Sequence, residues 1–138
     1  MKLAALLVAG SATMEGGAIN ATAIPTTRYD VDQIPLWLTV PVIVAVHAPR
    51  GDEYNPQLYV VCKDPEGTRR GTVRFGWEWP DQDDRPSKYR CFTERFSFAI
   101  ESAGEYTIGV YRDPDATDEI GPPIPIFIAL AGAASFSN

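Results

Sequence analysis

The chain contains few of the residues on which most catalytic and metal sites depend. Its 138 residues include one histidine, His47, and two cysteines, Cys62 and Cys91. Acid–base catalysis most often uses histidine, and a structural zinc site needs four ligands, mostly Cys and His. The sequence also lacks a glycine-rich phosphate loop that opens a helix. We therefore expect a protein that is not an enzyme and holds no cofactor or metal, and we interpret His47 as a structural residue at the end of an apolar run.

Long hydrophobic runs and clustered positive charge are missing as well. No run approaches the roughly 20 apolar residues of a membrane span. The formal net charge is -6, and twelve basic residues are dispersed among eighteen acidic ones, whereas nucleic-acid binding needs basic residues gathered on one face. We expect neither a membrane nor a nucleic acid as a partner. Nine of the basic residues are arginines, a bias that indicates a GC-rich genome such as that of an actinobacterium or one of its phages.

The two cysteines are predicted to lie on different faces of their strands. Cys62 shares a face with Leu58 and Val60, whereas Cys91 lies opposite the face that carries Phe92 and its apolar neighbours. This placement favours two free thiols in a reducing compartment such as a bacterial cytoplasm. A disulfide that joins the two sheets of a sandwich stays open as the alternative.

The apolar stretch Leu3–Ala9 has two interpretations. With Lys2 before it and small residues after it, the stretch looks like the start of a secretory signal. However, its apolar core is only seven residues long and a single positive charge precedes it. We therefore expect a buried first strand.

Short apolar or alternating runs, separated by turn residues, dominate the rest of the chain. They predict eight strands, at residues 2–10, 18–24, 42–46, 57–63, 70–79, 91–101, 105–112 and 123–130. Gly16 and Gly17 form a hairpin turn, and the tract Asp64–Gly67 has Pro and Gly where a type I turn needs them. Prolines at positions 25, 35 and 41 break up the connection before residue 42.

The tract Ser102–Tyr111 is the most informative about the fold class. A turn, Gly104 and Tyr106, followed by alternation, is typical of the entry to a late strand of an immunoglobulin-like sandwich, in which the tyrosine hydroxyl bonds back to nearby backbone. We predict one all-β domain, an immunoglobulin-like antiparallel β-sandwich of about eight strands over residues 1–130, followed by a C-terminal tail at 131–138.

Four of these features together carry a resemblance to known sequences. The opening Leu3–Ala9, the Gly16–Gly17 hairpin, the Asp64–Gly67 turn and the Gly104–Tyr106 entry resemble, in the same order, a family of small uncharacterised bacterial and phage proteins. The resemblance implies a compact sandwich-like domain and no particular activity. Such sequences have a shorter turn after the tyrosine strand, so the insertion at 113–119 is a candidate for a function of its own.

The insertion is rich in carboxylates. Hard oxygen ligands of the kind that calcium prefers could come from Asp113, Asp115, Asp118 and Glu119. The EF-hand pattern fails, because the sixth position is Asp118 where Gly is needed and the twelfth is Ile124 where Glu is needed. We favour a solvated turn without metal. The same holds for residues 81–84 unless the two loops meet.

Several aromatic and apolar residues are candidates for a surface. Trp77 and Trp79 alternate with polar residues, which predicts core, but Trp79 precedes Pro80 and is the one expected at the rim. Trp37 lies in the proline-bounded connection, where it could cover a sheet edge or reach a partner subunit. The run Ile126–Leu130 follows three prolines and is predicted to be an edge strand through which the chain associates with itself.

These observations lead to one hypothesis and two alternatives. We expect a non-enzymatic interaction module that binds a protein partner and forms a homo-oligomer, in a bacterial cytoplasm or as part of a virion. The predicted surface comprises Trp37, Tyr54, Trp79, Asp113, Asp115, Asp118 and Glu119. A virion structural or decoration protein, and a carbohydrate- or calcium-assisted ligand-binding domain, stay open as alternatives.

Overall fold

The computed structural model describes residues 1–131, so all of the predicted C-terminal tail except Ala131 lies outside the described residues. Every element assigned within them is a strand. The ten strands are β1 (Lys2–Val8), β2 (Ser11–Glu15), β3 (Ala18–Thr22), β4 (Arg28–Val31), β5 (Leu36–Pro49), β6 (Gln57–Lys63), β7 (Arg69–Gly76), β8 (Ser87–Ile100), β9 (Gly104–Tyr111) and β10 (Ile124–Leu130). No helix of membrane-spanning length and hydropathy is found in this part of the chain.

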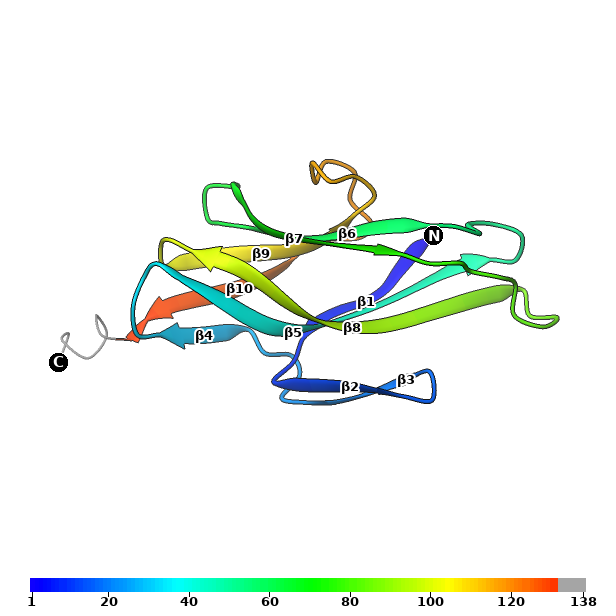
Figure 1. Ribbon diagram of the computed structural model, residues 1–138, viewed down its shortest axis with the longest axis horizontal. Coiled ribbons are helices and arrows are strands. Elements are labelled where there is room, and N and C mark those ends of the chain that lie inside the picture. The colour runs from blue at the N-terminus through cyan, green and yellow to red at the C-terminus, as the bar shows by residue number, and fades with distance from the viewer. Residues whose placement is uncertain (132–138) are drawn as a thin grey trace.

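The strands form two main sheets and a separate hairpin (Figure 1). The three-stranded sheet has the order β1-β5-β8, with antiparallel pairing throughout. The five-stranded sheet has the order β4-β10-β9-β6-β7 and is antiparallel except for the parallel pair β4–β10. The β2–β3 hairpin projects from the body of the molecule. The predicted all-β class is confirmed.

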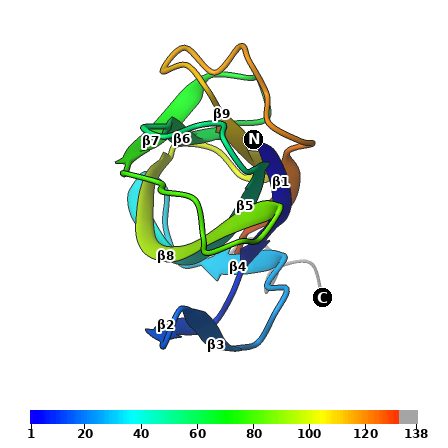
Figure 2. The same cartoon turned by 90° about the vertical axis from the view of Figure 1, so that its right-hand side faces the viewer.

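The sheets curl around the core instead of facing each other as two flat layers. Viewed along the long axis, they trace the outline of a half-barrel (Figure 2). Strands β7 and β8 approach so closely on one side that a Cβ atom at Gly71 would lie 2.5 Å from the Ser97 carbonyl oxygen. The predicted all-β class is therefore correct, whereas the chain has ten strands rather than about eight and its sheets do not form a clear immunoglobulin-like sandwich.

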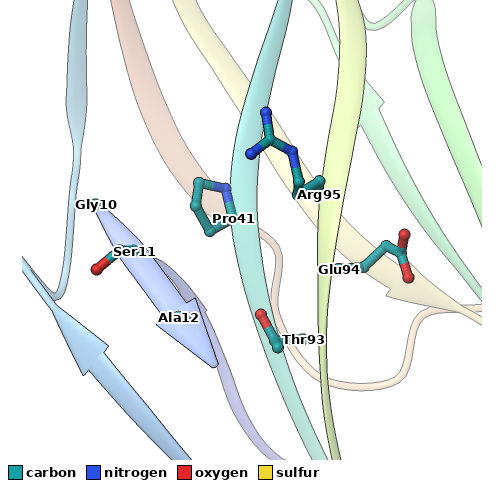
Figure 3. Close-up of a pocket in the computed structure, with 7 residues that line it drawn as sticks. All are labelled: Gly10, Ser11, Ala12, Pro41, Thr93, Glu94 and Arg95. Atoms are coloured by element: carbon teal, nitrogen blue, oxygen red, sulfur yellow. The ribbon is translucent and has the colours of Figure 1, made fainter. Parts of the chain in front are cut away.

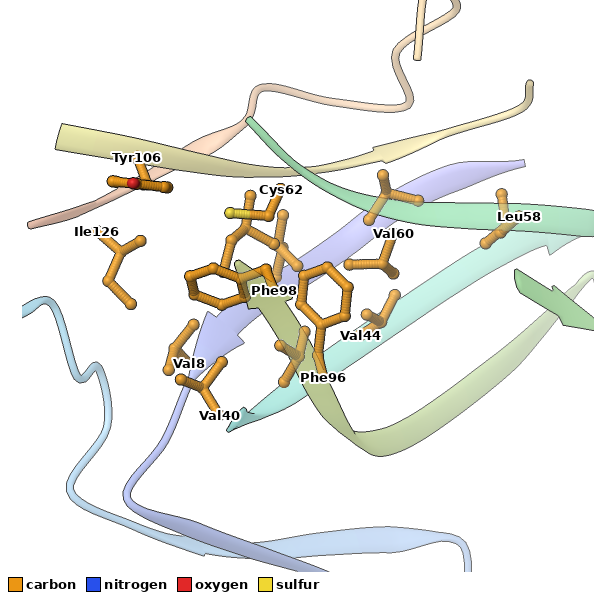
Figure 4. Packing of buried hydrophobic residues seen from close by; sticks show 14 of the residues in the cluster. Val8, Val40, Val44, Leu58, Val60, Cys62, Phe96, Phe98, Tyr106 and Ile126 are labelled. Carbon is orange, nitrogen blue, oxygen red and sulfur yellow. The ribbon is translucent and has the colours of Figure 1, made fainter. Parts of the chain in front are cut away.

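The core lies between the inner faces of the two sheets (Figure 4). Phe96 and Phe98 of β8 alternate with exposed residues and pack against Val40 and Val44 of β5. The five-stranded sheet supplies residues with less than 2% exposure, among them Leu58, Val60, Cys62, Tyr106 and Ile126. Burial of these side chains is the main source of stability in a domain of this size.

The most instructive difference from the predicted strands is that β5 runs through Pro41. The strand begins at Leu36 rather than at residue 42, so Trp37 lies in a strand and not in a connection. The Pro41 carbonyl accepts a hydrogen bond from Ala9 N at 3.0 Å, at the point where β1 leaves β5. Proline has no N–H to donate back to Ala9, so the ladder between β1 and β5 ends at this pair.

The predicted edge position of residues 123–130 is wrong. Strand β10 has β9 on one side and β4 on the other, with Leu130 opposite Val31. The four residues Arg28–Val31 alternate polar and apolar residues, but the run has the minimum length of a strand signal and lies among prolines, so β4 was not predicted. This short strand covers the edge through which self-association was expected.

Two local predictions are confirmed. The Tyr106 hydroxyl donates to the Ser102 carbonyl at 2.8 Å, as expected for the turn before β9. Both cysteines are free, with Cys62 in the core and Cys91 half-buried on β8. Burial raises the pKa of the Cys62 thiol to about 12.

Candidate functional site

The most exposed large hydrophobic side chain in the described part of the chain is that of Trp37. It is 69% exposed although it lies in the regular strand β5. Its cross-strand neighbour on β8 is Ala99, which is too small to shield the indole. A shallow hollow of about 270 Å³ beside it is lined by Pro35, Leu36, Ala99, Ile100 and Glu101. An exposed aromatic beside a hollow of mixed polarity is typical of a contact surface.

Trp37 begins a row of outward-facing side chains along the three-stranded sheet. On β5 the row continues with Thr39, Pro41, Ala45 and His47, which alternate with core residues. Their cross-strand partners on β8 are, in the same order, Ser97, Arg95, Cys91 and Tyr89. The row is apolar at the Trp37 end and mixed elsewhere, so Trp37 is its strongest candidate for contact with a partner.

The hairpin and the outer face of the three-stranded sheet form a groove of about 210 Å³ (Figure 3). Pro41, Thr93, Glu94 and Arg95 line one wall and the start of β2 lines the other, and the Glu94 side chain points away from β2. The Ser11 hydroxyl in this groove bonds with Thr22. The groove brings together no nucleophile with a base, and we assign it no chemistry.

A second groove contains the only histidine. His47 shares it with Asp52 and Ser87, the residue types of a hydrolytic triad. The imidazole stacks on Tyr89, with ring centroids 5.4 Å apart. Within residues 1–131, no hydrogen bond joins His47 to Ser87 or Asp52, so the nucleophile–base contact of such a triad is not made.

Trp79 does not lie at the rim, which corrects the prediction for this residue. Its side chain is only 2% exposed, because the alternation of β7 continues past Gly76 and places Trp79 on the same inner face as Phe75 and Trp77. The Trp79 carbonyl accepts a hydrogen bond from the buried Lys88 ammonium at 2.7 Å. The sequence offered no sign that Lys88 would be buried.

The exposed Tyr54 belongs to the same network. Its ring lies 4.4 Å from Lys88 Nζ, and its hydroxyl donates to Asp81 at 3.1 Å. Asp81 also accepts a hydrogen bond from Gly51 N, which is the main reason why its pKa is lowered. A buried ammonium needs such partners. The network therefore joins the loop before β6 to the loop before β8, and Tyr54 has a structural role.

The insertion at 113–119 is a cover over the outer face of the five-stranded sheet. Ala116 packs with Val61 and Tyr111 in a second, smaller apolar cluster. The Lys63 ammonium donates to the Ala116 carbonyl at 3.0 Å, and Arg69 donates to the Pro114 carbonyl at 2.7 Å. These contacts fix the loop to the sheet.

The Asp113 carboxylate serves the turn in this loop. It accepts hydrogen bonds from the Thr117 hydroxyl at 2.7 Å and from Asp118 N at 2.8 Å. The bond from Asp118 is the main cause of the lowered pKa of Asp113.

Among the described residues, no group of three or more His, Cys, Asp or Glu side chains could hold a metal ion. The loop between β7 and β8, which contains residues 81–84, lies near the right-hand end of the molecule in Figure 1, away from the orange loop at 113–119.

The predicted surface residues therefore do not form one site. Trp37 lies at the start of β5, which is at the left-hand end of the molecule in Figure 1. Tyr54 and Trp79 belong to the network of Lys88 and Asp81, and the acidic insertion lies over the five-stranded sheet. Among the predicted aromatic residues, Trp37 is the one that is exposed and makes no side-chain hydrogen bond; the side chains of Asp118 and Glu119 are also exposed and make none, but they are charged. Comparison with known proteins found no matching family model, curated protein or solved structure.

Proposed function

We propose that this protein is a non-enzymatic protein-binding domain whose contact surface is centred on Trp37. The observation that carries the proposal is the 69% exposure of that indole on a regular strand. A tryptophan placed this way exposes a large apolar surface, and its burial by a partner would stabilise the complex. Tryptophan is also among the residues most enriched in interface hot spots.

The strand arrangement supports a binding role by analogy. Strands β5 and β8 pair in one sheet, β6, β9 and β10 are neighbours in the other, and the chain crosses between the sheets before Tyr106. This order resembles that of an immunoglobulin-like frame, in which the B and E strands pair opposite C, F and G, and the tyrosine corner lies between E and F. In this protein the sheets are curled. Because folds of this kind host many functions, the proposed function is argued from the Trp37 surface and not from the fold.

Capture of a partner from a lysate of the bacterial host tests the proposal. Wild-type protein, Trp37→Ser and Phe127→Ser are immobilised at equal density, and retained proteins are identified by mass spectrometry. Phe127 is a matched control because it is an exposed aromatic of a strand, at 43% exposure, on the other sheet. We expect a reproducible partner with wild type and Phe127→Ser that is lost with Trp37→Ser. Equal retention by all three proteins would contradict the assigned surface.

A further inference from the structure

We infer that the partner of the Trp37 surface is a second copy of this chain, and that the two copies join through an open edge of β5. The open edge is the segment Leu36–Val40, which pairs with β8 on one side. On the other side β1 pairs only with Val42–His47 before it turns away toward the hairpin. Within residues 1–131, no strand pairs with Leu36–Val40 on that side. The inference rests on the proposed function, because it names the partner of that surface.

The direction of the free backbone groups follows from Pro41. Its carbonyl points to the open side, because it accepts the last hydrogen bond from the β1 segment, from Ala9 N. In a regular strand the N–H and C=O of alternate residues point to the same side. Thr39 and Trp37 therefore present their N–H and C=O groups to the open side. Consistent with this, the Thr39 and Ser97 hydroxyls lie 2.7 Å apart, as expected for a close, non-hydrogen-bonded pair with β8.

This pattern is complementary to itself. If two copies meet in antiparallel orientation with Leu38 opposite Leu38 of the second copy, then Trp37 of each lies opposite Thr39 of the other. In both residues the backbone N–H and C=O point toward the other copy, so each Trp37–Thr39 pair can form two backbone hydrogen bonds. The two-fold symmetry gives two such pairs, and therefore four hydrogen bonds. The Trp37 indole then lies against the facing Thr39 side chain, a favourable cross-strand contact. The result is a two-fold interface of the kind most common in homodimers.

The chemistry of the edge distinguishes it from the two edges of the five-stranded sheet. Proteins protect free edges with charged residues, short strands or covering segments. The edge strand β4 has four residues and contains Arg28 and Asp30, and the edge strand β7 contains Arg69, Arg70 and Arg74. In contrast, Leu36–Val40 has no charge and exposes Trp37. An unprotected apolar edge indicates pairing with another strand.

The register makes a test by cross-linking possible. In a background with Cys91→Ser, which leaves only the buried Cys62, Leu38→Cys should form a disulfide-linked dimer on mild oxidation of the full chain. Two Leu38 residues facing each other would have Cα atoms about 4.5 Å apart, within the range of a disulfide. Leu36→Cys is the matched control, since Leu36 is also partly buried but would lie about 13 Å from its copy. We expect a covalent dimer with the first variant only.

A backbone test in solution complements the cross-linking. Sedimentation equilibrium of the full chain should give twice the monomer mass. Thr39→Pro removes the N–H on the open side and should weaken the dimer about tenfold or more. Thr39→Val keeps that N–H and loses only the hydroxyl contact with Ser97, so it should remain dimeric.

The outcomes separate this inference from the proposed function. A monomeric wild type, or a dimer that is unaffected by Thr39→Pro and not cross-linked by Leu38→Cys, overturns the inference. If a host protein is nevertheless captured in a Trp37-dependent manner, the proposed function stands and the open edge or its surroundings bind a different protein. Two results together support the pairing as described. Leu38→Cys forms a covalent dimer on oxidation, and the dimer of the chain without the cross-link is weakened by Thr39→Pro.

Discussion

Replacement of Gly71 by alanine tests how β7 and β8 close one side of the molecule. An ideal Cβ at this position would lie 2.5 Å from the Ser97 carbonyl oxygen, and 2.7 and 3.0 Å from Phe98 Cβ and Cα. Ordinary contact begins near 3.4 Å, so the two strands must separate by roughly 0.9 Å. The obstructing atoms are backbone and Cβ atoms of the buried strand β8, which cannot rotate away as a flexible side chain would.

The magnitude follows from two opposing effects. Overpacking of a well-packed site costs about 1–3 kcal/mol, while the loss of glycine freedom in the unfolded chain returns about 0.4–1 kcal/mol. We expect Gly71→Ala to lower the free energy of unfolding by about 1–2 kcal/mol. Equilibrium urea denaturation, followed by tryptophan fluorescence, measures this value.

Gly76 provides the matched control on the same strand. A Cβ there would meet its nearest atom, Gln57 Cγ, at 3.7 Å, which is ordinary contact. Gly76→Ala should therefore leave the stability unchanged or raise it slightly. If Gly71→Ala proves as stable as Gly76→Ala, with the same dependence on urea concentration, then the close approach of β7 and β8 is wrong.

Three further predictions concern single groups. Tyr106→Phe removes the hydrogen bond to the Ser102 carbonyl and should lower the free energy of unfolding by about 1 kcal/mol; an unchanged urea midpoint would argue against a stabilising role for that bond. A thiol reagent should modify one cysteine of the native protein, Cys91, and reach Cys62 only after unfolding, because burial raises the pKa of Cys62 to about 12; two modified thiols in the native protein would refute this. Asp113→Ala should be less stable than wild type at neutral pH. Since the pKa of Asp113 is lowered from 3.8, mainly by the hydrogen bond from Asp118 N, its contribution is present above that value and is lost as the pH falls through the folded-state pKa. The gap between the two proteins should therefore narrow in acid, and a gap equally wide at neutral and acid pH would contradict it.

Local features of the chain were predictable because their causes are local. The Asp64–Gly67 turn forms with a hydrogen bond from Gly67 N to the Asp64 carbonyl, and Gly67 has a φ of +87°. The Tyr106 corner, the hairpin at Gly16–Gly17 and the strand Gln57–Lys63 also match the expected positions. In each case residues adjacent in the sequence supply both the signal and the contacts.

The candidate site was predictable only in part, for a reason that Trp37 and Trp79 show together. Both are tryptophans close to a proline, and the residue next to Pro80 was expected to be the more exposed of the tryptophans on the β7 side. The structure buries Trp79 at 2% exposure and leaves Trp37 at 69%. The difference depends on neighbours from distant segments, since Lys88 packs against Trp79 and Tyr54, whereas the residue that faces Trp37 across the sheet is the small Ala99.

The sequence by itself determined the all-β class, the positions of most strands and the faces of Cys62 and Cys91, because alternation and turn residues act over a few positions. Only the tertiary structure decided which strand edges are covered. Whether β10 or β5 has a free edge depends on where β4 and β1 end in space, and that is set by packing between segments up to a hundred residues apart. For this reason the self-association expected at β10 is now assigned to the open edge of β5.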